Sequence, residues 1–302
     1  MVINKSLVPW LLALCSCTAG LIDIELPDNG QVIVINGFIR DGRSELTLML
    51  STEADDTIDL IAPNYLDGAD ILLEDNTGKT FTFRPSGRGR YLLDTALSNR
   101  QHYTVVAKWN SLTARVDNIE LPPPLPSVDV SDGHATTNDD EEYCFTQKCI
   151  SFDLSYRLGP GTAPHLLIQS DIPVTDSVDA PRLYSRFSEE IIASCQITQS
   201  NYLSWPTECF AGEELVRFPF FVGLDSRLLQ TDMDPAYFPD SVYLAVSTVQ
   251  PILTEHLRSL QNTDNPFEQI FVVPNLYVSN VTGGLGIVSG ASTTYYAFAV
   301  ER

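Results

Sequence analysis

Four cysteines in the second half of the chain have a spacing that suits covalent cross-linking. Cys144 and Cys149 lie close together, and Cys195 and Cys209 are separated by a short stretch. An even number of cysteines in an exported chain predicts two disulfides, and three pairings are possible. Sequence proximity favours Cys144–Cys149 and Cys195–Cys209. A zinc site is the alternative, but neither spacing is Cys-x-x-Cys and no histidine is near either pair.

Two further cysteines, Cys15 and Cys17, close an N-terminal stretch that has the features of a leader. A single positive residue precedes the apolar run 7–14, which is too short to span a bilayer. Leu14 and Ser16 stand at −3 and −1 before Cys17, a pattern that resembles a bacterial lipobox. The resemblance implies cleavage before Cys17, diacylglycerol on its sulfur, and a fatty acyl chain such as palmitate on its new amino group. Cys15 would put bulky Leu14 at −1, and an ordinary secretory signal is the alternative.

The charge of the chain excludes some partners. The formal net charge is −21, and removing residues 1–16 makes it one unit more negative because Lys5 is lost. Nucleic-acid binding requires a basic footprint, so we expect no nucleic-acid partner. The same charge argues against a polybasic grip on anionic lipid, so the lipid on Cys17 would do the anchoring.

Motifs of catalysis and of cofactor binding are missing from the sequence. The glycine-rich block 283–290 lacks the third glycine of a dinucleotide fingerprint, and residues typical of a strand follow it. A tight turn and close backbone packing explain this block better. The four histidines are scattered, and no nucleophile elbow, zinc-protease or phosphate-loop motif is present. The sequence therefore predicts no enzyme, no cofactor and no metal.

Aromatic residues crowd the region around the Cys195–Cys209 stretch. Tyr202, Trp205 and Phe210 are the candidates for a ligand-binding face, because rigid aromatic side chains are typical anchors of interfaces. Packing in the core is the competing interpretation, and it is favoured for part of this group.

The pattern of the chain predicts a mainly β fold in two domains. Seven short stretches of alternating apolar and polar residues, separated by Gly, Asn and Asp turns, predict an immunoglobulin-like β-sandwich over residues 31–121. The prolines of 122–126 predict a semi-rigid linker. Residues 1–16 are the expected signal peptide, and 17–30 are the expected lipidated tether.

Residues 127–302 are expected to form a second β-rich domain with one or two helices. Residues 252–261 have the clearest helical periodicity, and the apolar spacing of 182–194 also predicts a helix. The acidic stretch 127–143 is interpreted as a solvated loop, with a calcium site as the weaker alternative because it lacks the ligand spacing of an EF-hand.

Short motifs occur along the mature chain: an Asn-Pro-Phe segment at 265–267, an Asn-x-x-Gly-Gly-Leu-Gly block at 280–286 and an Asn-Gly-Phe-Ile segment at 36–39. Together they resemble a Bacteroidota lipoprotein family, domain-of-unknown-function family 4249 (DUF4249). The residues after Gly286 depart from the aromatic that is common in the family. The resemblance implies a partner of a TonB-dependent outer-membrane β-barrel receptor in nutrient uptake, and it supplies no catalytic residues.

We therefore expect an outer-membrane lipoprotein, lipid-anchored at the cell surface, that captures ligand for a TonB-dependent transporter. The periplasmic face is the alternative location. A structural, adhesive or envelope-assembly lipoprotein without a small-molecule ligand is the alternative function.

Overall fold

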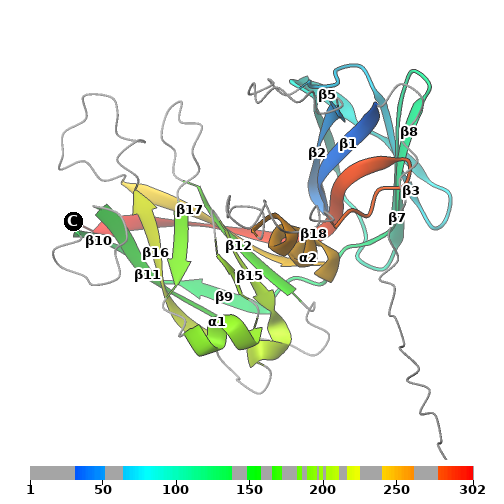
Figure 1. Ribbon diagram of the computed structural model, residues 1–302. Helices are drawn as coiled ribbons and strands as arrows, with labels where there is room; N and C mark the ends of the chain where they lie inside the picture. The colour runs from blue at the N-terminus through cyan, green and yellow to red at the C-terminus, as the bar shows by residue number, and fades with distance from the viewer. Residues whose placement is uncertain are drawn as a thin grey trace, which may run out of the picture.

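A period-two alternation of apolar and polar residues runs through much of the chain, and these stretches form strands in a computed structural model of the protein (Figure 1). The structure describes residues 31–51, 64–137, 148–157, 165–171, 182–185, 189–195, 197–199, 202–210, 216–224, 240–261 and 278–301. Within these residues the fold is mainly β with two α-helices, as the sequence predicts. Two β-rich halves share one long strand, β18 (Gly284–Glu301).

The first half is a sandwich of two sheets. One sheet contains the order β5-β6-β2-β1, and the other has the order β4-β3-β7-β8. The strands are β1 (Val32–Arg40), β2 (Gly42–Ser51), β3 (Asp70–Asp75), β4 (Thr80–Thr82), β5 (Arg84–Gly87), β6 (Arg90–Thr95), β7 (His102–Trp109) and β8 (Leu112–Glu120). All seven strands expected in this region are present. The short strand β5 was missed, because Pro85 and Gly87 indicated only a turn, and it lies at the sheet edge where proline is tolerated.

Inward-facing side chains of both sheets form the core of the sandwich. Successive residues of a strand point to opposite faces, so every second residue of β1, β2, β7 and β8 faces the partner sheet. Fully buried members of this cluster include Ile33, Ile35, Leu46, Leu48, Leu73, Val105 and Val116. Burying one such side chain stabilises the fold by about 1.5–3 kcal/mol. The sandwich therefore rests on the same alternation that identified its strands.

Tyr103 ties the turn before β7 to the start of that strand. Its side chain is buried, and its hydroxyl accepts the N–H of Ser98 at 2.7 Å and donates to the carbonyl of Ser98 at 3.1 Å. Burial raises the pKa of the Tyr103 phenol above its ordinary value, so the hydroxyl keeps its proton at neutral pH. The phenol thus satisfies two backbone groups of this turn.

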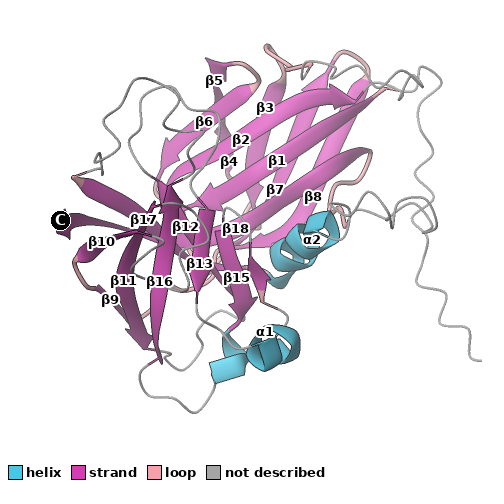
Figure 2. Cartoon of the chain, turned by 60° about the vertical axis from the view of Figure 1, so that its left-hand side comes forward, coloured by secondary structure: helices cyan, strands magenta, loops and turns pink. Residues whose placement is uncertain are grey.

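Strand β18 runs through both halves of the molecule, as Figures 1 and 2 show. Its first part pairs in parallel with β1, from Ile33 opposite Gly284 to Arg40 opposite Ala291. Its second part pairs antiparallel with β17 (Ser241–Val249). Ala291 has partners in both strands and is fully buried. The C-terminal segment therefore completes the sandwich predicted from the N-terminal region and also belongs to the second half.

The glycine-rich block 283–290 lets β18 cross the sandwich at close range. A Cβ at Gly286, where φ is 110°, would collide with the carbonyl oxygen of Ile35. A Cβ at Gly290 would collide with the carbonyl oxygen of Glu120 and lie 2.6 Å from its carbonyl carbon. The prediction of close backbone packing at this block is confirmed.

The side chains of Asn280 and Asn36 form hydrogen bonds with the backbone of β18 in the same region. Asn280 donates from Nδ2 to the carbonyl of Val288 at 2.7 Å and accepts the N–H of Val288 at 3.1 Å. Asn36 Oδ1 accepts the N–H of Ile287 at 2.9 Å. The Asn-x-x-Gly-Gly-Leu-Gly block thus has a structural role in holding the first part of β18 in the sandwich.

The second half places two groups of strands on either side of a second apolar core. Strand β11 pairs with β9, β10 and β16, while β12 pairs with β15 and β17. The further strands and helices are β9 (Ser127–Val130), β10 (Gly133–Thr137), β11 (Lys148–Arg157), β12 (His165–Asp171), β13 (Arg182–Ser185), α1 (Glu189–Cys195), β14 (Thr198–Gln199), β15 (Tyr202–Pro206), the 3-10 helix η1 (Thr207–Phe210), β16 (Val216–Leu224) and α2 (Pro251–Gln261). The helix predicted over 252–261 is confirmed by α2.

Two expectations for this half are wrong in part. The stretch 127–143 was interpreted as a solvated loop, but β9 and β10 pair with β11 there, and 138–147 lies outside the described residues. The stretch 182–194 begins as strand β13 on β16, and its described residues from Glu189 onward are helical. In both places pairing with a strand distant in sequence overrides the local pattern.

The proline-rich linker is fixed to both halves. Leu121 is buried in the first core, and Leu125 packs against the second. The hydroxyl of Thr248 in β17 donates to the carbonyl of Pro123 at 2.7 Å. A smaller third cluster, built around Leu167, Leu253 and Ile287, lies beneath α2, which sits beside β18 where the halves meet (Figure 2). These contacts hold the linker and α2 against the place where the two halves meet.

Candidate functional site

The aromatic group proposed from the sequence as a binding face lies in the second core where it is described. Trp205 on β15 is fully buried, and its indole Nε1 donates to the hydroxyl of Tyr156 at 3.1 Å. Phe210 packs edge-on to Trp205 with ring centroids 6.4 Å apart. The side chain of Tyr202 lies outside the described part of the structure. We therefore assign a packing role to Trp205.

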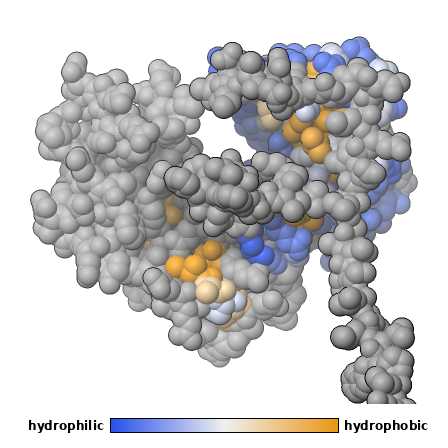
Figure 3. Space-filling view, viewed as in Figure 1, coloured by the Kyte–Doolittle hydropathy of each residue, from blue (hydrophilic) through white to orange (hydrophobic). Residues whose placement is uncertain are grey.

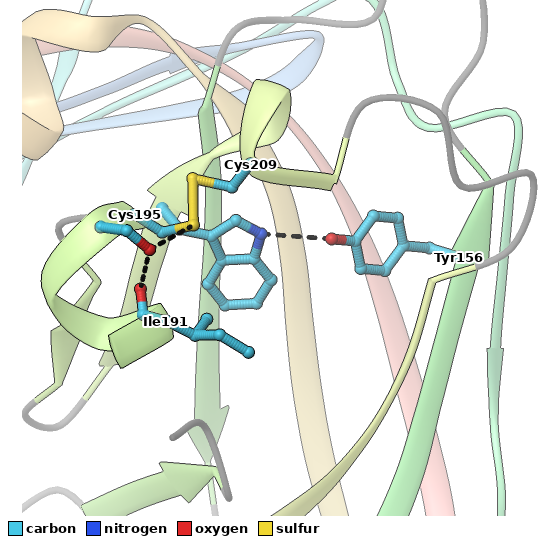
Figure 4. The surroundings of a disulfide bond; sticks show 6 residues. Tyr156, Ile191, Cys195 and Cys209 are labelled. Atoms are coloured by element: carbon cyan, nitrogen blue, oxygen red, sulfur yellow. Dashed lines mark hydrogen bonds between the residues drawn. A yellow bond between two sulfur atoms is a disulfide. The ribbon is translucent and has the colours of Figure 1, made fainter. Parts of the chain in front are cut away.

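A disulfide covers this aromatic core. Cys195 at the end of α1 is joined to Cys209 in η1, with Cα atoms 5.6 Å apart (Figure 4). Closing a loop of this length stabilises a fold by about 3 kcal/mol in the chain-entropy model. Cys149 is buried and disulfide-bonded, whereas Cys144 lies outside the described residues. Cys17 also lies outside them.

Replacing Tyr156 with phenylalanine tests the aromatic core. Burial raises the pKa of the Tyr156 phenol well above its ordinary value, so the neutral hydroxyl serves as the acceptor for the indole N–H. Tyr156→Phe removes that acceptor and should lower the free energy of unfolding by about 1–3 kcal/mol in urea titrations. Tyr243→Phe is the control, because Tyr243 is 46% exposed on β17. Equal losses in both variants would contradict the assignment.

A different place in the fold has the features of a ligand site. A cavity of about 420 Å³ is lined by Arg40, Asp41, Arg43, Glu45, Thr293 and Tyr295. The end of β1, the turn residue Asp41 and the start of β2 supply the first four residues, and β18 supplies the other two after it leaves β1. We call this cavity the junction pocket. In the view of Figure 3, much of the described surface of the sandwich is hydrophilic.

Arg40 is the central residue of the junction pocket. Alternation along β1 puts Phe38 and Arg40 on the same face, and the guanidinium carbon lies 4.5 Å from the centre of the Phe38 ring. Its Nη1 donates to the Tyr295 hydroxyl at 3.1 Å. The Ser44 hydroxyl bonds both the N–H and the carbonyl of Arg40 at 2.9 and 3.1 Å. The guanidinium is therefore held from two sides on a fixed strand end.

The junction pocket holds two arginines and two acids, and each acid has a hydrogen-bond partner elsewhere. Asp41 accepts the N–H of Leu97 at 3.0 Å, and Glu45 accepts Nε of Arg90 at 2.8 Å. Arg43 makes no hydrogen bond or ion pair within the described part of the chain. Both acids thus have partners outside the pocket lining.

Arg43 has one acidic neighbour across the sheet. It lies opposite Asp94 in the β2–β6 register, and Asp94 forms an ion pair with Arg84. The acid nearest to Arg43 in the ladder is therefore already neutralised by another arginine.

One buried donor of the junction pocket has no acceptor among the residues that the structure describes. It is the Nε of Arg40. Such an orphaned donor costs about 1–3 kcal/mol, more when it carries charge, and calls for a missing partner such as water or ligand. Burial lowers the pKa of Arg40 while Tyr295 and Glu45 act in the opposite direction, and a guanidinium stays protonated in proteins. The pocket can therefore accept a ligand that brings hydrogen-bond acceptors.

Two carboxyl groups outside the junction pocket are hydrogen-bonded to neighbouring side chains. The Thr77 hydroxyl hydrogen bond is the main cause that lowers the pKa of Asp75, and the Arg115 hydrogen bond lowers the pKa of Asp117. Within the described ranges, no group of three potential His, Cys, Asp or Glu metal ligands occurs. No helix there is both long and apolar enough to cross a membrane.

Sequence reasoning missed the junction pocket. Arg40 and Tyr295 are far apart in the chain, and only the parallel pairing of β1 with β18 brings them together. The one local signal is Phe38-x-Arg40, which places an aromatic ring and a guanidinium on one strand face.

Comparison with known proteins identifies the family of the chain. No curated protein matches it. A family model described as domain of unknown function (DUF4249) matches residues 21–297, which include every strand of both halves apart from the last residues of β18. The chain therefore belongs to the DUF4249 family.

Proposed function

We propose that this protein is a non-catalytic, lipid-anchored outer-membrane lipoprotein that captures ligand for a TonB-dependent β-barrel transporter. The lipobox-like sequence before Cys17 supports the anchor. The likeness to Bacteroidota lipoproteins supports the partner and a place at the cell surface. The family match begins shortly after Cys17, so the folded part would follow the anchor closely.

The junction pocket is the observation that carries the capture role. Its volume of about 420 Å³ is within the usual range of small-ligand sites, which is about 300–1,000 Å³. It combines an aromatic rim at Tyr295 with two arginines, and it lies on strands that belong to a locked junction. A rigid frame around polar groups is what a binding site needs, because little ordering remains to be done when ligand arrives.

We also propose that the sandwich is immunoglobulin-like. The orders β5-β6-β2-β1 and β3-β7-β8 correspond to the D-E-B-A and C-F-G orders of that fold. The hydroxyl of Tyr103, bonded to the backbone of Ser98 before β7, resembles the tyrosine corner of such domains. Immunoglobulin-like modules are common in surface proteins, which is in keeping with an exposed accessory role.

Co-purification tests the proposed partnership. A tag on the C-terminus of the membrane-extracted protein should bring down a TonB-dependent β-barrel receptor. Cys17→Ser should leave both halves folded, release the protein from membranes washed in high salt, and reduce recovery of the barrel. A protein that is recovered alone would count against the partnership, and a Cys17→Ser variant that stays membrane-bound would count against the lipid anchor.

The alternative function is a structural, adhesive or envelope-assembly lipoprotein without a small ligand. The burial of Trp205 favours this alternative in one respect, because that residue of the expected aromatic face is not available to ligand. Recovery of cell-wall or adhesion partners in place of a transporter would decide for it.

A further inference from the structure

We propose that the junction pocket binds a carboxylate group on its ligand, with Arg40 as the principal contact and Arg43 as the second cation. This inference rests on the proposed capture role, since it names the chemistry of the captured ligand. It starts from the way in which Arg40 is held.

Arg40 presents a preorganised edge for a planar anion. Its Nη1 is engaged by Tyr295, and Phe38 supports one face of the guanidinium. The donors left are Nε, which is buried without an acceptor, and Nη2. These two N–H groups point in parallel from one edge of a guanidinium, and this spacing matches the two oxygens of a carboxylate. Because Nε is closed to solvent in this structure, a ligand carboxylate would contact Nη2 first and would supply the acceptor that Nε lacks after a shift of the Arg40 side chain.

The charges around Arg40 favour one negative charge over two. Arg43 adds a second cation, while Asp41 and Glu45 line the same pocket and are only partly offset by Leu97 N–H and Arg90. A dianionic phosphate would meet both acids, whereas a carboxylate brings a single charge. Negative groups that lie more than about 8 Å from the pocket act on it weakly at physiological ionic strength, because salt screens charges beyond that distance.

Titration with small carboxylates, a neutral sugar and phosphate gives a direct test. The detergent-solubilised full-length protein is titrated at low ionic strength with glucuronate, glucose, N-acetylglycine and inorganic phosphate. We expect saturable binding of glucuronate, N-acetylglycine or both, and none of glucose. The first compound indicates a sugar acid and the second a peptide end, and binding of either supports the inference. Absent carboxylate binding, equal binding of glucose, or tighter binding of phosphate would overturn it.

Matched arginine variants place the binding at Arg40. Arg40→Lys keeps the charge but removes the paired donors, so carboxylate affinity should fall about tenfold or more. Arg84→Lys is the control, because Arg84 is bound to Asp94 on the same sheet and does not line the pocket. Affinity that is unchanged in Arg40→Lys, or equally reduced in Arg84→Lys, would overturn the assignment.

Two further measurements keep the test decisive. If Arg40→Lys has a lowered unfolding midpoint, Tyr295→Phe is used instead. It removes the hydroxyl that holds Nη1 and leaves the charge of Arg40 unchanged. The guanidinium is then held less firmly, so carboxylate binding should still weaken. If carboxylate binding fails while the transporter co-purifies, only this inference falls. If carboxylate binds and no transporter is recovered, the proposed partnership falls instead.

Discussion

Gly290→Ala is expected to lower the free energy of unfolding by about 3 kcal/mol or more, which is the upper end of overpacking costs. The added Cβ would collide with the carbonyl of Glu120 and lie 3.2 Å from the peptide nitrogen of Leu121. Both are backbone atoms, so no side-chain rotation relieves the clash. The N–H of Gly290 also donates to Gln250 at 2.9 Å, and a shifted strand would lose that bond.

Equilibrium unfolding in urea, followed by circular dichroism, checks this expectation. Gly68→Ala is the matched control, since Gly68 has φ of 89° but open space around its missing Cβ. It should cost only the strain of a left-handed alanine, about 1–2 kcal/mol. A Gly290→Ala variant that is no less stable than Gly68→Ala would contradict the predicted backbone clash.

Local pattern was enough to find most of the strands. In β1 the partly exposed Val34 separates the buried Ile33 and Ile35, and the same period-two rule identified β7, β11, β12 and β17. It failed at β9, β10 and β13, whose strand character comes from pairing with β11 and β16. These are short strands with weak local signals, because the paired strands supply most of their stabilisation.

The C-terminal strand shows a second limit of local reasoning. The residues after the glycine-rich block 283–290 were recognisable as strand from their own pattern. Nothing in their own sequence indicates that they form one strand, β18, with that block or that its first part pairs in parallel with β1. Only the glycine spacing of 283–290 marked a close approach, without naming the backbone that is approached.

The candidate site was the least predictable part, for the same reason. Tyr202, Trp205 and Phe210 attracted attention because they cluster in sequence, and Trp205 proved to be core. Arg40 and Tyr295 are distant in sequence and meet only through the register of β18. The junction pocket therefore depends on the integrity of a single strand.

Removal of β18 is expected to unfold both halves. A chain that ends at Gly283 loses Val288 from the first core and Phe298 from the second. It also leaves hydrogen-bonding edges of β1 and β17 without their partner. Trp109 in β7 reports on the sandwich and Trp205 on the second half, so single-tryptophan variants of the mature chain distinguish them by fluorescence. Both tryptophans should show the red-shifted emission of an unfolded chain.

A shorter truncation separates the two roles of the strand. A chain that ends at Ser292 keeps all the pairing of β1 with β18, from Gly284 to Ala291, and loses most of the pairing with β17. The emission of Trp109 should then remain native while that of Trp205 shifts to the red, because only the second core loses residues. Native emission from Trp109 in the chain that ends at Gly283 would show that the sandwich folds without its C-terminal strand. The junction pocket would then be an appended feature of the sandwich, rather than a product of the strand that joins the halves.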